Sequence, residues 1–282
     1  MKRVESSYSR PIVEASRSAL LELSLTLRSY VDALVLVGGR VPYFLLRDQR
    51  ASDGELEHVG SIDIDLVVDP DKIGADEYAT IIEIITDRGW APLESRQFSF
   101  VRQVVSSVDG RPYAISVDFL AADQDRLAGG GRHRKVQRDL NARIMRGAPL
   151  ALAHQCGISI DGRLPSSGWA AAEIRMADVV GCIAMKGLAF GARLVEKDAY
   201  DIYAVLDNLE GGPTGVASSF RPFVGDPLVA KSIENIRRMF LGSGSAGALL
   251  VADFFSGERG SARDRRALRA SRIVAAFIEA LG

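Results

Sequence analysis

Residues 61–68 read Ser-Ile-Asp-Ile-Asp-Leu-Val-Val, and the fold prediction starts from this stretch. Apart from the serine and the two aspartates every residue is aliphatic, which predicts a strand buried on at least one face. Because side chains alternate along a strand, Asp63 and Asp65 leave the sheet on the same side. Two neighbouring carboxylates on an apolar strand repel each other, and a Mg²⁺ ion is the simplest compensation. The alternative is that both are solvated at a sheet end and inert.

The sequence before this strand is typical of a phosphate-binding turn. A short apolar strand over residues 33–37 ends at Gly38 and Gly39. A helix can begin at Arg40, because Pro42 is tolerated in a first turn. A strand, a glycine turn and a helix N-terminus allow backbone N–H groups to approach a phosphate. Together the two segments predict a nucleotide and metal site.

A third carboxylate follows on a predicted hairpin. Residues 98–105 and 113–120 are rich in β-branched and aromatic side chains, and Asp109-Gly110 lies between them. This dipeptide is a strong hairpin signal. Asp118 therefore enters near the end of an antiparallel strand, and the sheet is expected to be mixed. In this order of motifs, residues 30–120 resemble the nucleotidyltransferase superfamily related to DNA polymerase beta.

The second half of the chain is predicted to be helical and carries two further charged motifs. Residues 171–193 have apolar positions at helical spacing, with Lys186 among small and apolar neighbours. A following helix places Asp198 and Asp201 three residues apart, hence on one face. Two interpretations remain open at this point. Lys186 and Asp201 form a structural ion pair between helices, or Lys186 stabilises a phosphate and is oriented by Asp201.

These helical motifs, Ala-Met-Lys-x-x-Ala and Lys-Asp-x-x-Asp-Ile-Tyr, resemble those of the AbiEii/AbiGii group of bacterial nucleotidyltransferase toxins. The resemblance spans residues 30–210. It implies three metal-binding and catalytic carboxylates, Asp63, Asp65 and Asp118, and two more catalytic residues, Lys186 and Asp201. It also implies a nucleotide-binding set made of Gly38, Gly39, Arg40 and Asp198.

The function that the resemblance implies is Mg²⁺-dependent transfer of a nucleoside monophosphate from an NTP to an acceptor hydroxyl, with release of pyrophosphate. By resemblance the acceptor is tRNA, and the chain is the toxin of a type IV-like toxin–antitoxin or phage-defence system with a separate antitoxin as partner. Two rivals remain: nucleotidylation of a protein or a small molecule such as an antibiotic, and an NTP-binding module without turnover.

Two basic segments are candidate contacts for tRNA phosphates. One is a glycine-rich basic loop over residues 129–135 that continues to Arg138 and Arg143, with residues 132–138 as the proposed contact. The other is a set of arginines on a predicted C-terminal helix: Arg263, Arg265, Arg266, Arg269 and Arg272. The alternative in both cases is a solvated surface.

Composition sets the class of protein. The 282 residues are 47% hydrophobic and 25% charged, enough for a substantial core, and the formal net charge of −1 excludes a generally basic coat. The two cysteines form no CxxC motif, which argues against a structural zinc site or a disulfide framework. No signal peptide or apolar span is recognised, so a soluble cytoplasmic protein without membrane contact is expected. The expected fold is α/β (α+β), with a mixed-sheet nucleotidyltransferase core over residues 1–168 and a helical domain over residues 169–282.

Overall fold

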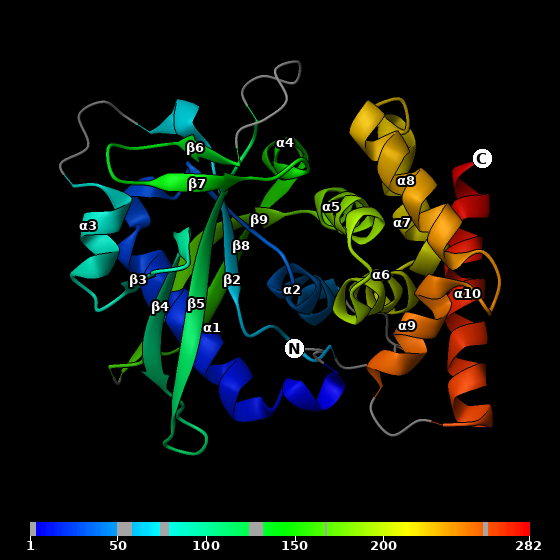
Figure 1. Cartoon of the computed structure of the whole chain (residues 1–282), viewed down its shortest axis with the longest axis horizontal. Coiled ribbons are helices and arrows are strands. Elements are labelled where there is room, and N and C mark those ends of the chain that lie inside the picture. The colour runs from blue at the N-terminus through cyan, green and yellow to red at the C-terminus, as the bar shows by residue number, and fades with distance from the viewer. Residues whose placement is uncertain (1–3, 50–57, 74–78, 124–131, 167, 256–258) are drawn as a thin grey trace. The chain divides into compact units, whose positions relative to one another are not determined.

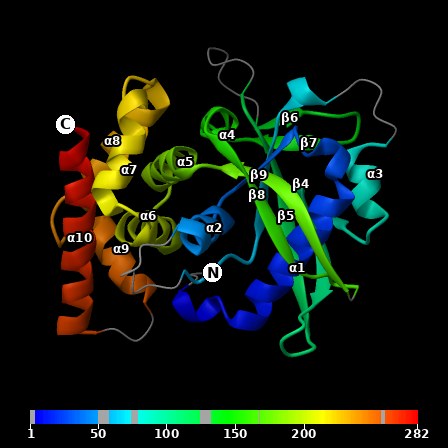
Figure 2. The ribbon, with the colours of Figure 1, turned by 180° about the vertical axis from the view of Figure 1, so that it is seen from behind.

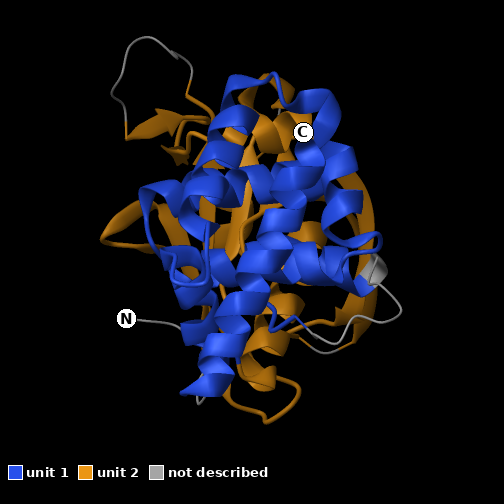
Figure 3. Cartoon of the chain, turned by 90° about the vertical axis from the view of Figure 1, so that its right-hand side faces the viewer, with its two compact units in different colours: residues 1–8, 41–60, 178–282 blue, residues 9–40, 61–177 orange. Residues whose placement is uncertain are grey.

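The computed structural model describes residues 4–49, 58–73, 79–123, 132–166, 168–255 and 259–282 (Figure 1). The chain divides into two compact units (Figure 3). The sheet unit comprises Ser9–Arg40 and Ser61–Ala177, and the helical unit comprises Met1–Tyr8, Val41–Gly60 and Asp178–Gly282. The expected fold class, a mixed α/β sheet accompanied by a helical part, is confirmed.

The sheet unit is built on a nine-stranded sheet in which β3-β4-β5-β2-β1-β9-β8 are neighbours in that order. The remaining two strands extend it beside β5, where β7 pairs with β5 and β6 pairs with β7. The strands are β1 (Leu34–Val37), β2 (Ile64–Val68), β3 (Ala91–Leu93), β4 (Arg96–Val105), β5 (Pro112–Ala121), β6 (His133–Lys135), β7 (Asn141–Ile144), β8 (Gln155–Arg163) and β9 (Trp169–Ala177).

The sheet is mixed, as the sequence predicts. β2 is antiparallel to β1 and parallel to β5, whereas β4 and β5 form the predicted antiparallel hairpin. At the hairpin turn the Asp109 carboxylate accepts a hydrogen bond from the backbone N–H of Arg111, and Gly110 has φ +70°. Asp and Gly therefore occupy this turn because one supplies a local acceptor and the other tolerates a left-handed backbone.

Helix α1 (Arg10–Thr26) covers one face of the sheet, where it packs on β4, β5, β8 and β9 (Figure 2). Its buried side includes Ala15, Ala19, Leu20 and Leu23. Pro11 stands in the first turn of this helix, a position at which proline is tolerated. Leu66 of β2 lies on the face that α1 covers, and because strand side chains alternate, Asp65 points to the opposite face.

Two shorter helices complete the sheet unit, namely α3 (Ile81–Thr86) and α4 (Ala148–Ala153), and 3-10 turns lie at η2 (Arg28–Tyr30) and η3 (Pro70–Lys72). The apolar spacing within residues 75–90 predicts a helix, and residues 75–78 of that range lie outside the described residues. The described helix begins after the cap residue Thr80, whose hydroxyl accepts from the backbone N–H of Glu83 at 3.1 Å. In return, the Glu83 carboxylate accepts a hydrogen bond from the backbone N–H of Thr80 at 2.8 Å, and the two bonds fix the start of the helix.

The helical unit contains six complete helices in the described part of the chain, α5 (Val179–Ala192), α6 (Glu196–Asn208), α7 (Gly212–Phe220), α8 (Pro227–Phe240), α9 (Ala246–Phe254) and α10 (Ser261–Leu281), and two 3-10 turns, η1 (Glu5–Ser7) and η4 (Arg221–Phe223). Helix α2 (Arg40–Gln49) begins in the sheet unit and continues in this one. Helices α5 and α8 pack closely because glycines face α8: a Cβ on Gly191 would lie 2.1 Å from the Asn235 amide nitrogen.

Two secondary-structure predictions were wrong. Residues 171–193 do not form one helix, because β9 extends to Ala177 and α5 begins only after Asp178, whose carboxylate caps it through the Gly181 N–H. Pairing of β9 with β8 and β1 overrides the helix preference of its alanines. The apolar run at residues 150–153 also predicts a short strand, but these residues are helical in α4. The predicted boundary at 168/169 accordingly moves to 177/178, and residues 41–60 join the helical unit.

In the described segments, no helix is both long enough and apolar enough to cross a membrane.

Candidate functional site

The strand register brings the predicted carboxylates of the sheet unit onto one face. Val37 of β1 is the partner of Asp65, and Asp65 is the partner of Asp118 on the adjacent strand β5. Directly paired residues point to the same face of a sheet, so Asp65 and Asp118 lie side by side on the face opposite α1. Asp63, which precedes β2, joins them, because its charge acts on the ionisation of Asp118.

Two serines hold these carboxylates in place. The Ser99 hydroxyl of β4 donates to Asp118 Oδ1 at 2.6 Å, and the Ser116 hydroxyl of β5 donates to Asp63 Oδ1 at 2.9 Å. Ser99 is the register partner of Asp118 and is only 1% exposed. Sequence reasoning missed both serines, since a lone serine on a strand carries no motif.

Burial raises the pKa of Asp118 above its ordinary value, and the charge of Asp63 raises it further. The hydrogen bond from Ser99 and the charges of Arg96 and Arg143 act in the opposite direction and favour the carboxylate. A carboxyl group with a raised pKa next to a second carboxylate is a common feature of sites that bind cations or move protons, although ion-pair networks also produce it.

The glycine turn is built against Asp65. Gly38 has φ +75°, and a Cβ placed on it would lie 2.0 Å from Asp65 Oδ2. Glycine is therefore required at this position twice, once for the left-handed backbone and once for the close approach of the carboxylate. Gly39 follows, and α2 begins at Arg40.

The Arg40 side chain, which the resemblance assigns to the nucleotide, is fully buried inside the sheet unit. Its guanidinium donates to the Ser16 hydroxyl and, at 2.5 Å, to the Ser61 carbonyl. Ser61 is two residues before Asp63, so Arg40 fixes the backbone that leads into the carboxylate pair. These contacts favour a supporting role for Arg40 over a direct contact with a ligand.

The carboxylate face has the donors that Mg²⁺ prefers. Within the described ranges no group of three or more His, Cys, Asp or Glu residues forms a complete metal-binding set. A Mg²⁺ ion does not need one, because it commonly takes one or two carboxylates and fills its remaining positions with water and substrate phosphate oxygens. Asp65 and Asp118, which are paired in register, therefore offer the ligand chemistry of an ion that takes part of its shell from water or substrate oxygens.

Lys186 and Asp201 meet in the helical unit, where they belong to a buried charge cluster. Lys186 Nζ lies 2.6 Å from Asp201 Oδ2 and 3.0 Å from Asp198 Oδ1. Lys197 also pairs with Asp201, and Arg193 pairs with Asp198 at 3.0 Å. Lys186 is 8% exposed and Asp201 is fully buried. Each charge is compensated inside the cluster, which favours the structural alternative left open for this pair.

His58 completes this cluster and was not predicted as part of it. Its Nδ1 accepts from the backbone N–H of Gly60 at 3.0 Å, so the proton of the neutral ring is on Nε2. That N–H faces Asp201 Oδ1 at 2.9 Å. The Tyr200 hydroxyl accepts from the N–H of Val59 at 3.2 Å. The cluster therefore anchors residues 58–60 to α6. No local sequence pattern predicts this contact, because its partners are far apart in the sequence.

Burial dominates the ionisation of the cluster. It lowers the pKa of His58 to about 4, with the charge of Lys197 acting in the same direction. It also lowers the pKa of Lys197 to about 8, despite the nearby Asp201. Burial would raise the pKa of Asp201, but Lys186 and Lys197 outweigh it and hold that pKa well below its ordinary value. Asp201 is thus an anion that stabilises two cations at once.

The first basic segment is more ordered than the sequence suggested. Residues 129–131 lie outside the described residues, but Arg132 is followed by β6, which pairs with β7. The strand pairing places β7 beside β5 directly after Asp118, with Leu120 opposite Arg143. The Arg143 guanidinium lies 5.7 Å from the centre of the Phe98 ring, and Arg138 pairs with Glu83.

Three of the five C-terminal arginines have partners within the helical unit. Arg263 pairs with Asp253 at 2.7 Å, Arg269 pairs with Asp207 at 3.1 Å, and the Arg266 guanidinium lies 4.1 Å from the centre of the Phe255 ring. Arg265 and Arg272 are exposed. These contacts favour a structural role for three of the five arginines, namely Arg263, Arg266 and Arg269.

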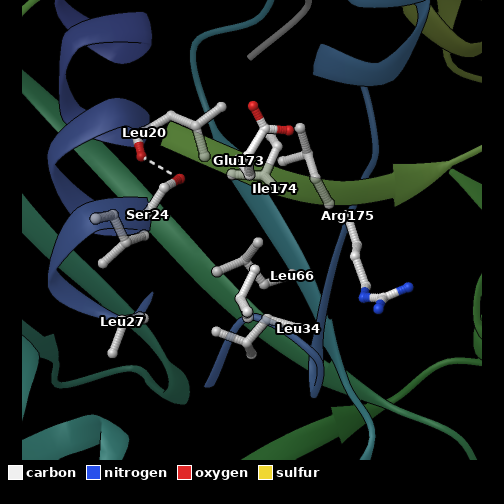
Figure 4. A pocket seen from close by; sticks show the side chains of 11 residues that line it. Leu20, Ser24, Leu27, Leu34, Leu66, Glu173, Ile174 and Arg175 are labelled. Atoms are coloured by element: carbon white, nitrogen blue, oxygen red, sulfur yellow. Dashed lines mark hydrogen bonds between the residues drawn. The ribbon is translucent and has the colours of Figure 1, made fainter. Parts of the chain in front are cut away.

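An apolar pocket opens on the other face of the sheet (Figure 4). Leu20 and Ser24 of α1, and Leu27 directly after it, line this pocket opposite Leu34 and Leu66 of the sheet. The Ser24 hydroxyl donates to the Leu20 carbonyl at 2.7 Å and is therefore engaged within the helix. This pocket is separate from the carboxylate face, because Leu66 and Asp65 point to opposite sides of β2.

Comparison of the chain with models of known protein families, with curated proteins and with solved structures gave no match. The functional assignment therefore depends on the residues of the chain itself.

Proposed function

We propose that the chain is a Mg²⁺-dependent nucleotidyltransferase that moves a nucleoside monophosphate from an NTP to an acceptor hydroxyl, and that tRNA is the acceptor. The observation that carries this proposal is the register Val37–Asp65–Asp118, which aligns the glycine turn with two carboxylates from neighbouring strands. On one sheet face the carboxylates would supply oxygen ligands for a metal ion, and the glycine turn would supply backbone N–H groups for a phosphate.

In this proposal Asp63, Asp65 and Asp118 hold the Mg²⁺ ion. Such an ion would supply Lewis-acid stabilisation of the negative charge that develops on the phosphates during transfer. The turn at Gly38 and Gly39 presents backbone N–H groups without side chains that would block a phosphate. Asp118 is also suited to accept the proton of the acceptor hydroxyl, because its raised pKa brings it closer to neutral pH.

The buried cluster has a different place in the proposal. Lys186, Asp198 and Asp201 stabilise the helical unit, because their charges are buried and mutually paired. This is the ion-pair interpretation that the sequence left open. The tRNA contact is assigned to the exposed cations of the β6–β7 hairpin, which follow Asp118 along the edge of β5. An antitoxin partner remains part of the proposal on the basis of the resemblance alone.

Nucleotide binding tests the first step. We expect the protein to bind at least one of the four NTPs, with an affinity that depends on Mg²⁺ when measured by isothermal titration calorimetry. Asp65→Asn keeps the shape of the side chain but removes its charge, and it should abolish the Mg²⁺ dependence. Asp161→Asn on the exposed strand β8 is the matched control and should behave as wild type. Absence of binding for all four nucleotides would overturn the proposal.

The rivals separate by the fate of the label. With α-labelled NTP and total tRNA, label on RNA that disappears on RNase treatment supports the tRNA acceptor. Label that persists on polypeptide supports protein nucleotidylation instead. Mg²⁺-dependent binding without incorporation into either would favour the module without turnover or a small-molecule acceptor, and thin-layer separation of the products distinguishes these two outcomes.

A further inference from the structure

Two hydroxyl groups on the carboxylate face have no role in the proposed function so far. Ser99 lies between two phenylalanines, Phe98 and Phe100, in the middle of an apolar stretch of β4. A hydroxyl at 1% exposure among apolar side chains costs free energy unless it is hydrogen-bonded. The Ser99 hydroxyl donates a hydrogen bond to Asp118 Oδ1 at 2.6 Å. The hydrogen bond to Asp118 therefore accounts for a serine at this buried position.

The geometry of the two hydroxyl–carboxylate pairs is equivalent. Ser116 precedes Asp118 by two residues on β5, so both point to the same face. Ser116 reaches Asp63 Oδ1 at 2.9 Å, and Ser99 reaches Asp118 Oδ1 at 2.6 Å. An ionised carboxylate only accepts hydrogen bonds, so each serine is the donor. Each hydrogen bond uses one lone pair of one carboxylate oxygen and restricts rotation of the carboxylate about χ2.

We propose that Ser99 and Ser116 are positioning residues that fix the carboxylates of Asp118 and Asp63 in the orientation that receives a divalent cation. This inference rests on the proposed function in that the cation is the one shared with the nucleotide. Partners that orient metal ligands commonly change metal affinity by about 10- to 100-fold when they are removed.

The chain offers a matched control for this inference. Ser106 follows β4, is also 1% exposed, and its hydroxyl donates to a carboxylate, that of Glu14, at 2.9 Å. Ser106→Ala therefore removes the same kind of bond from the same unit without touching Asp63 or Asp118. A general loss of stability would appear in both variants, whereas a positioning effect appears only at Ser99 and Ser116.

The experiment has two readouts, and Mn²⁺ serves as the probe for the cation. Isothermal titration calorimetry should show Mn²⁺ binding about 10- to 100-fold weaker in Ser99→Ala and Ser116→Ala, and unchanged in Ser106→Ala. In parallel, ¹³C NMR of labelled aspartates, assigned with Asp118→Asn, follows the carboxyl groups without metal. The carboxyl chemical shift of Asp118 should change in Ser99→Ala, and that of Asp63 should change in Ser116→Ala. Ser99→Thr, which retains a hydroxyl, should restore both readouts.

The outcomes separate this inference from the proposed function. If the wild-type protein binds no Mn²⁺, the proposed function fails, and the metal-free NMR readout still decides whether the serines orient the carboxylates. If Mn²⁺ binds but Ser99→Ala and Ser116→Ala match Ser106→Ala in Mn²⁺ affinity and in the carboxyl chemical shifts of Asp118 and Asp63, the positioning role is overturned while the metal site stands. Circular dichroism establishes that each variant is folded, and Ser116, at a half-buried position, gives the test should Ser99→Ala not fold.

Discussion

Replacement of Gly38 by alanine should be unusually destabilising, and its cost can be divided into two parts. The backbone at Gly38 has φ +75°, and holding an alanine in a left-handed conformation costs about 1–2 kcal/mol. In addition, the new Cβ would lie 2.0 Å from Asp65 Oδ2 and 2.9 Å from its Cγ. Overpacking of this kind typically costs a further ~1–3 kcal/mol. The expected total for Gly38→Ala is therefore about 2–5 kcal/mol.

Gly110 isolates the backbone part, because it has φ +70° and nothing within 4 Å of its added Cβ. Gly110→Ala should cost about 1–2 kcal/mol. A double variant isolates the steric part, since Asp65→Ala removes the two nearest atoms. The destabilisation by Gly38→Ala should be smaller in that background than in wild type.

The assay is urea denaturation followed by circular dichroism, with local opening of β1 and β2 checked by hydrogen exchange. If Gly38→Ala destabilises the protein no more than Gly110→Ala, or if Asp65→Ala brings no relief, the close packing of the turn against Asp65 is refuted.

Three further predictions concern the helical unit. The free energy of unfolding of this unit, read from hydrogen exchange in α6, should fall by about 3 kcal/mol as the pH drops from about 6.5 to about 4. In that window the unfolded chain takes up a proton at His58 and the folded chain does not. An equal dependence of stability on pH in His58→Gln would contradict this. Lys186→Met should lower the free energy of unfolding by about 3–5 kcal/mol, because it leaves Asp198 and Asp201 buried with less compensating charge. Lys231→Met breaks an exposed 2.9 Å pair with Glu234 and should lower it by less than about 1 kcal/mol. Equal losses of stability in thermal or urea unfolding would refute this difference. Gly191→Ala should cost about 1–3 kcal/mol through its clash with Asn235, and Asn235→Ala should relieve part of that cost in a double-mutant cycle; strict additivity would count against the contact.

The strands around the carboxylates could be predicted from the sequence, because local sequence patterns specify them. The aliphatic run at residues 64–68 and the Asp109-Gly110 turn each carry their own signal, and the hairpin then places Asp118 without further information. Local signals failed at residues 169–177, where alanines favour a helix but pairing with β8 and β1 imposes a strand. Tertiary pairing is decided by partners that the segment itself does not encode.

The contacts that orient the site were not accessible in the same way. Ser99 meets Asp118 only because the hairpin register aligns them, and His58 meets Asp201 only after the helical unit has formed. The sequence identified Lys186 and Asp201 as a pair but left their role open. Their burial and the presence of Asp198 and Lys197 in the same cluster favour stabilisation over catalysis.

Transfer of label from NTP tests the central claim most directly. The protein is incubated with Mg²⁺, total tRNA and one NTP labelled either at the α- or at the γ-phosphate, beside Asp65→Asn and Lys186→Met. The account predicts that α-label but not γ-label appears on RNA, that Asp65→Asn abolishes the transfer, and that Lys186→Met, when folded, retains it. Transfer that persists in Asp65→Asn, or γ-label on the product, would contradict the assignment of this carboxylate face as a nucleotidyl-transfer site.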